Sequence, residues 1–113
     1  MKFHRPDRVS SLLRDQLNKL LLREIEVPDA LITITEVIVS KDVTEAMIKV
    51  SVLPSKKGEE ALEILQKAKR HLQYKLVRMM NIKPTPHIDF RLDRGPEKAA
   101  GVEKALLNED LEE

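Results

Sequence analysis

Apolar residues recur along the chain at two different spacings, and these predict helices and strands in a definite order. Over residues 6–26, apolar positions return every three or four residues, the period of a helix that buries one face. Residues 31–40 are rich in β-branched side chains, and their alternation slips between Ile34 and Val37, which predicts a strand with a β-bulge. Residues 45–53 alternate cleanly after a predicted turn at 41–44, so the two strands form a hairpin.

The second half of the chain predicts a long helix and a third strand. The helix spans residues 59–80, and its apolar stripe consists of five residues, Leu65, Ala68, Leu72, Leu76 and Met79. Lys69 falls inside this stripe, and because burying an unpaired ammonium is costly, we expect a kink or short interruption at Ala68–Arg70. The alternative is a continuous helix with Lys69 at the margin of the stripe. The strand follows at residues 87–93.

These elements predict an α+β fold with helices on one face of a three-stranded sheet. The order is helix, strand, strand, kinked helix, strand, and then a short C-terminal helix at 96–107. A chain of 113 residues suits one domain, and 42% hydrophobic with 3% aromatic residues predicts an aliphatic core. The acidic residues 108–113 are expected to form a disordered tail.

The polar face of the long helix is mostly basic, although the whole chain is nearly neutral at +1. Residues 65–94 contain eight Lys or Arg against two acids, a net of +6, whereas residues 95–113 have a net of −4. The side chains opposite the apolar stripe are Lys67, Arg70, His71, Tyr74, Lys75 and Arg78. Lys and Arg gathered on one helix face indicate nucleic-acid binding, and a merely solvated face is the structural alternative.

Composition excludes several classes of function. With no cysteine, the chain has no disulfide, cysteine zinc site or thiol nucleophile, and it is compatible with a reducing compartment. The N-terminal residues lack the apolar segment of a signal peptide, and no stretch approaches the roughly 18 apolar residues of a membrane span. We therefore expect a soluble, cytoplasmic protein that does not contact a membrane.

No arrangement of residues predicts catalysis, a cofactor or a metal. The three glycines are isolated, so they form no Gly-rich phosphate loop. His4, His71 and His87 lack the spacing of metal ligands and are interpreted as solvated or structural. Asp89 and Asp93 lie four apart on one strand face, too far to share a proton. We expect the protein not to be an enzyme and to use no cofactor and no metal.

The basic helix gives partial support to an RNA-binding function. Phosphate contacts from basic side chains supply affinity but no sequence information. Base stacking needs exposed aromatic rings, and Tyr74 is the good candidate because Phe90 is expected in the core. This pattern favours recognition of the backbone and shape of a structured RNA.

Several stretches resemble the ribosome-binding factor A family of bacterial small-subunit maturation factors, from Arg5 to about Leu107. They are RPDRVSSLLRDQLNKLLLREIEVP, ITITEVIVSKDVTEAMIKVSVLP, the A-x-x-H-L pattern that begins at Ala68, and PTPHIDFRLDRG. The combination of R-P-x-R-V near the start with V-x-x-S-x-D from Val37 to Asp42 is the more specific part.

The resemblance implies a type II KH-like fold with an Ala-x-Gly kink in place of the phosphate-clamping loop of KH domains. The matching positions here are Ala68, Lys69 and Arg70, so an arginine replaces the glycine. Because a left-handed turn without glycine costs about 1 kcal/mol or more, we expect a gentler kink, with Arg70 available to contact phosphate.

The resemblance further implies a non-enzymatic, monomeric assembly factor with a KH-like RNA-binding domain at residues 1–107. It would bind the free or immature small ribosomal subunit and its rRNA near the neck, but not intact ribosomes. It would assist late maturation and 5′-end processing of that rRNA, leave before translation, and support growth in the cold. The predicted RNA contacts are Lys67, Lys69, Arg70, Lys75, Arg78 and Lys83, with Arg5, Arg8 and Arg91 as secondary contacts.

Two other functions stay open at this point. One is a KH-like domain that binds a different structured RNA. The other is a protein–protein interaction module that uses the acidic C-terminal end or an exposed sheet face. An enzyme that uses His87 or Asp89 is a more distant alternative.

Overall fold

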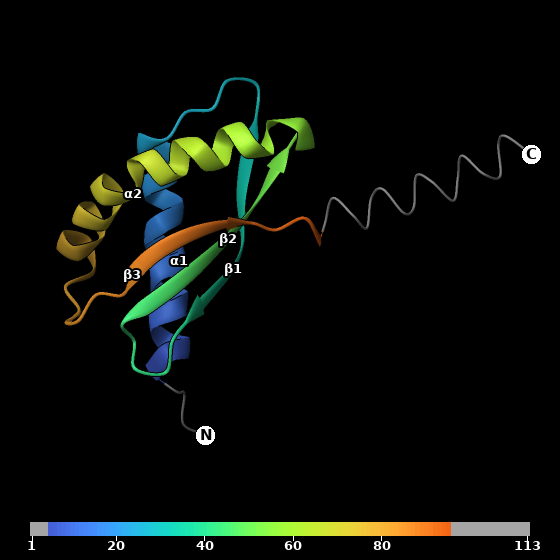
Figure 1. Ribbon diagram of the computed structural model, residues 1–113. Coiled ribbons are helices and arrows are strands. Elements are labelled where there is room, and N and C mark those ends of the chain that lie inside the picture. Colours follow the sequence, from blue (N-terminus) through green and yellow to red (C-terminus); the bar gives the residue numbers. More distant parts are fainter. Residues whose placement is uncertain (1–4, 96–113) are drawn as a thin grey trace, which may run out of the picture.

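Two helices lie on one face of a three-stranded sheet (Figure 1). The computed structural model describes residues 5–95, so the predicted helix at 96–107 and the predicted tail at 108–113 lie outside the described residues. The elements are α1 (Arg5–Glu24), β1 (Leu31–Val39), β2 (Glu45–Leu53), a short 3-10 helix (Ser55–Lys57), α2 (Gly58–Met80) and β3 (His87–Leu92). The predicted α+β class and the order of these elements are confirmed.

The sheet combines an antiparallel hairpin with a parallel third strand. β1 pairs antiparallel with β2, and β3 pairs parallel with β2, so the order across the sheet is β1-β2-β3. The pairing of β1 with β2 shifts between Ile34 and Glu36, which confirms the predicted bulge. Because of this extra residue, Ile34 and Val37 both face the helices although they lie three positions apart.

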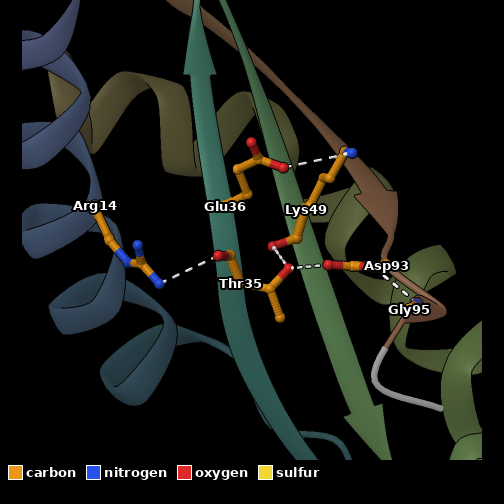
Figure 2. Close-up of polar contacts among 6 residues, drawn as sticks. All are labelled: Arg14, Thr35, Glu36, Lys49, Asp93 and Gly95. Carbon is orange, nitrogen blue, oxygen red and sulfur yellow. Dashed lines mark hydrogen bonds and ion pairs between the residues drawn. The ribbon is translucent and has the colours of Figure 1, made fainter. Parts of the chain in front are cut away.

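The bulge also ties β1 to the end of β3. The Thr35 hydroxyl donates to the Asp93 carboxylate at 2.7 Å, and it lies 3.3 Å from the Lys49 carbonyl of β2 (Figure 2). The backbone N–H of Gly95 donates to the same carboxylate at 2.9 Å. The hydrogen bond from Thr35, followed by that from Gly95, lowers the pKa of Asp93 below its ordinary value. These contacts fix the direction in which the chain leaves the sheet.

The core is aliphatic, as the composition predicts. Its fully buried side chains come from both helices and from the helix-facing side of the sheet, and include Leu13, Leu17, Leu20, Ile48, Val50, Leu65, Leu72, Leu76 and Phe90. Each such side chain stabilises the fold by about 1.5–3 kcal/mol relative to an exposed position. The opposite sheet face has half-buried Met47, Lys49 and Ser51, so it is open to solvent as predicted.

The hairpin turn places a strained valine in the core, which the sequence pattern does not predict. Val43 is 3% exposed and has φ 61°, a left-handed conformation that β-branched residues rarely adopt. Asp42 holds the turn, because its carboxylate accepts hydrogen bonds from the hydroxyls of Ser40 and Thr44, both at 2.7 Å. These bonds lower the pKa of Asp42. The V-x-x-S-x-D pattern is therefore a turn that anchors Val43.

The long helix bends along its course but does not break (Figure 1). Of the predicted kink or short interruption, only the interruption is absent, since α2 is continuous α-helix through Ala68, Lys69 and Arg70. Lys69 is compatible with the helix because its ammonium reaches past the apolar stripe to Asp89 of β3, at 3.2 Å. Arg70, which stands where the resemblance implies a glycine, meets no steric penalty, because its backbone is helical.

Candidate nucleic-acid interface

The outward face of α2 presents a line of exposed basic and aromatic side chains. Lys67, Arg70, Tyr74 and Arg78 are all exposed and follow one another at spacings of three or four residues. Residues with this spacing are neighbours on a helix surface, so the four side chains form one continuous strip. We call these four residues the α2 strip. His71 and Lys75 lie beside it.

Acidic residues neutralise part of this face. Lys67 pairs with Glu63 one turn earlier at 3.0 Å. Glu24, at the end of α1, lies 3.2 Å from His71 and 3.8 Å from Lys75. The hydrogen bond from His71 is the largest cause of a lowered pKa at Glu24, and the charge of Lys75 adds to it. Glu24 therefore joins the two helices and holds Lys75 partly neutralised.

Two arginines of the α2 strip have no acidic partner among residues 5–95. Among residues 5–95, no acid pairs with Arg70. Arg78 contacts Tyr74 instead of an acid: its Nη1 donates to the Tyr74 hydroxyl at 2.9 Å, and its Cζ lies 5.6 Å from the ring centroid. Exposed cations without an acidic partner are the ones best placed to contact phosphate.

Lys69 lies on another side of α2 and is not part of the strip. Its ammonium pairs with the Asp89 carboxylate, which also accepts a hydrogen bond from the Phe90 N–H at 3.0 Å. Partial burial opposes ionisation of Asp89, but the hydrogen bonds from Lys69 and Gln66 and the charge of Lys69 outweigh it, so the pKa is lowered. Asp89 is thus a structural partner of α2.

The other predicted contacts are dispersed over the surface. Arg8 is exposed near the start of α1, about 24 Å along that helix from Glu24, which meets the middle of α2. Arg91 is exposed on the open sheet face of β3, and Lys83 is exposed in the loop after α2. The side chain of Arg5 is outside the described part of the chain. The structure brings Lys67, Arg70, Lys75 and Arg78 together and separates Arg8 and Arg91 from them.

Two features of this surface are not predicted from the sequence. One is the contact between Tyr74 and Arg78. The sequence feature that could have indicated it is their spacing of four residues, which places two side chains side by side on a helix. The other is a groove of about 510 Å³ on the open sheet face. The groove has two cations, Lys69 and Arg91, and two acids, Glu45 and Asp89. It therefore attracts an anion less strongly than the α2 strip does.

The described part of the chain gives no sign of a metal site or a membrane span. Within residues 5–95, no group of three or more His, Cys, Asp or Glu is arranged to hold a metal ion. The helices of the same residues are too short or too polar to cross a bilayer.

The three-stranded sheet and its two helices define a small α+β domain of the KH-like class. The sequence model of ribosome-binding factor A matches residues 5–106. The chain belongs to the ribosome-binding factor A family.

Relatives of known name are similar over most of their length. The ribosome-binding factor A of Synechococcus sp. (strain WH7803) is 39% identical over 102 residues, which is 87% of this chain and 73% of the relative. That of Dictyoglomus thermophilum is 33% identical over 112 residues, covering 96% of this chain and 93% of the relative.

Solved structures of the family have the same fold. The crystal structure of ribosome-binding factor A from Thermus thermophilus has a TM-score of 0.68 and 25% identity, covering 80% of this chain and 97% of that one. A homology model of the Thermus thermophilus protein, fitted into a cryo-electron microscopy map of its complex with the 30S subunit, has a TM-score of 0.65. It is 27% identical and covers 74% of this chain and 90% of that one.

Proposed function

We propose that this chain is a non-enzymatic assembly factor that binds the free or immature small ribosomal subunit in the cytoplasm. Membership of the family supports this, as does the similarity to a Thermus thermophilus relative fitted into a map of a 30S complex. The α2 strip is the surface that contacts the rRNA, with Lys75 beside it and with Arg5, Arg8, Lys69, Lys83 and Arg91 as outlying contacts.

The protein acts by binding alone. It binds a late conformation of the small-subunit rRNA more tightly than earlier conformations. This difference in affinity shifts the rRNA toward the late conformation. It thereby assists late maturation and 5′-end processing, and it does so as a monomer that leaves before translation. Stabilising an RNA conformation matters most in the cold, where misfolded RNA rearranges slowly.

One observation supports this function more than any other. Arg70 and Arg78 lie two turns apart on the exposed face of α2, and neither pairs with an acid within residues 5–95. A phosphate backbone supplies the missing negative charge, and its release of counterions favours binding.

Co-sedimentation with free small subunits, large subunits and intact ribosomes tests the proposal. The wild-type protein should sediment with free small subunits selectively, whereas the double variant Arg70→Glu/Arg78→Glu should stay unbound. The matched control is Lys41→Glu/Lys56→Glu, which changes the net charge by the same amount at two exposed positions outside α2, in the hairpin turn and in the 3-10 helix. Equal binding to all three particles would contradict small-subunit specificity. An equal loss of binding in the α2 variant and in the control would show that the α2 strip is not the RNA-binding surface.

A protein-binding function is the second candidate, and one surface feature favours it. A groove of about 260 Å³ between α1 and β1 is lined almost entirely by apolar side chains. At its margin Leu22 is 87% exposed and Leu31 is 61% exposed. If this groove were the binding surface, co-sedimentation would resist salt and Leu22→Ser would abolish it, while the α2 variants would bind normally.

A further inference from the structure

Tyr74 occupies the middle of the α2 strip in a position that packing does not explain. The ring is 57% exposed, although tyrosine usually buries most of its apolar body. Arg70 lies one turn before it and Arg78 one turn after it on the same face of α2. The strip therefore places an aromatic ring between two arginines that have no acidic partner among the described residues.

Arg78 contacts the Tyr74 ring and its hydroxyl together. The guanidinium lies 5.6 Å from the ring centroid and donates a hydrogen bond of 2.9 Å to the tyrosine hydroxyl. Such a contact restrains two side chains that would otherwise move freely in solvent. Because less freedom remains to be lost, a ligand that stacks on this pair binds at a lower entropic cost.

The geometry points to a subsite for one unpaired nucleobase, formed by the Tyr74 ring and the Arg78 guanidinium. This inference rests on the proposed function and adds the type of RNA bound: a structured RNA that has a base free of its helix. A base and a tyrosine ring stack well because both are flat and apolar on their faces, and an arginine plane serves the same purpose.

The charges beside the ring favour RNA over other stacking partners. Arg70 and Arg78 lie about 12 Å apart along the helix axis, one on each side of Tyr74. A nucleotide that stacks on the ring has a phosphate on each side of its base, and each phosphate then faces an arginine. A fully paired duplex meets the two arginines but leaves the ring unused, since its bases are already stacked.

Intrinsic fluorescence tests this inference directly, because Tyr74 is the single tyrosine of a chain that has no tryptophan. Two RNA hairpins serve as probes, identical except that one contains a single unpaired adenosine in its stem. The full-length protein should bind the hairpin with the unpaired base about tenfold more tightly. Its tyrosine emission should be quenched by that hairpin and much less by the fully paired one.

Three variants separate stacking from folding and from charge. Tyr74→Phe keeps the ring and should keep most of the preference. Tyr74→Leu should lose the preference while its affinity for the fully paired hairpin stays unchanged. Val77→Ser is the control, an exposed neighbour on α2 outside the strip, and it should bind both hairpins as wild type does.

Equal affinity and equal quenching with both hairpins would overturn the subsite, and so would a preference that survives in Tyr74→Leu. Failure of the proposed function has a different signature: the hairpin preference would persist while selective co-sedimentation with small subunits is absent.

Discussion

The side-chain amide of Gln73 makes two hydrogen bonds at the start of β3. It accepts from the Ile88 N–H and donates to the carbonyl of Pro86, the residue just before the strand, both at 2.8 Å. Gln66, two turns earlier on α2, donates to the Phe90 carbonyl at 3.0 Å. The outer edge of β3 is thus covered by side chains of α2 in place of a fourth strand. Such cover prevents pairing with other chains, and it fixes the direction in which α2 presents its outward face.

α1 covers the opposite edge of the sheet in the same way. Arg14 donates to the Ile34 carbonyl at 2.9 Å and reaches the Thr35 carbonyl at 3.4 Å (Figure 2). Ser10 donates to the Val37 carbonyl at 3.0 Å. Both helices therefore have a buried stripe, a polar margin bonded to a sheet edge and a solvent face, and in α2 the solvent face is the basic one.

Replacing Gln73 tests the importance of the covered edge. Gln73→Leu leaves the buried Ile88 N–H without its partner, so we expect a loss of about 1–3 kcal/mol in the free energy of unfolding, measured by urea denaturation. Val77→Ala, an exposed position on the same helix, should stay within about 0.5 kcal/mol of wild type. Equal stability of Gln73→Leu and wild type would mean that solvent replaces the amide.

Glu24 restrains the basic face, so its neutralisation should strengthen RNA binding. In Glu24→Gln the charge that faces Lys75 is gone, and we expect about twofold to threefold tighter binding to free small subunits at low salt. Glu26→Gln, an exposed position two residues further on, makes the same charge change away from Lys75 and should bind as wild type does. The relevant measurement is a filter-binding titration. An equal gain in both variants would indicate a general charge effect.

Substitutions at the adjacent residues Lys69 and Arg70 should affect different properties, stability at Lys69 and RNA affinity at Arg70. Lys69→Gln removes an ion pair with Asp89 that is half exposed, so it should lower stability by at most about 1 kcal/mol and change RNA affinity little. Arg70→Gln should leave stability unchanged and weaken binding. Urea denaturation and filter binding on both variants give the comparison. Weaker binding of Lys69→Gln than of Arg70→Gln would place the RNA on the β3 side of α2.

Stability should fall in acid because several carboxylates are held ionised by the fold. The folded-state pKa values of Glu24, Asp42, Asp89 and Asp93 are lowered. A lowered pKa contributes stability above the ordinary carboxyl pKa, and this contribution is lost as the pH falls through the lowered value, below about pH 5.

The Asp42→Asn variant isolates one of these contributions. It should be less stable than wild type at pH 7, and the difference should shrink as the pH falls, because protonation removes the same charge from Asp42. Thermal melts at a series of pH values measure both effects. A constant difference at every pH would show that the Asp42 charge does not hold the turn.

The sequence predicts those parts of the fold that depend on neighbouring residues. Helical and alternating periods place the five main elements, and the phase slip locates the bulge, because each follows from which side chains must face one core. Lys69 shows the limit of this reasoning. Its place in the apolar stripe predicts a kink or a short interruption. The helix bends but stays continuous, because the Lys69 ammonium reaches Asp89, 20 residues away.

The remaining features depend on contacts between distant segments. The parallel pairing of β3 with β2, the bonds of Gln73 to β3, and the link between Glu24 and His71 across 47 residues have no signature within a short window. The same holds for the candidate site. The sequence predicts a basic face on α2, but only the fold distinguishes Arg70 and Arg78 from cations that are neutralised by acids.

The salt dependence of binding to free small subunits shows whether the α2 strip contacts the RNA backbone. Each phosphate contact contributes about one unit to the slope of log affinity against log salt concentration. Arg70→Gln/Arg78→Gln should bind more weakly and have a slope smaller by about two, while Lys41→Gln/Lys56→Gln should keep the wild-type slope. Identical slopes in the wild type and the α2 variant would contradict the claim that this helix binds the RNA backbone.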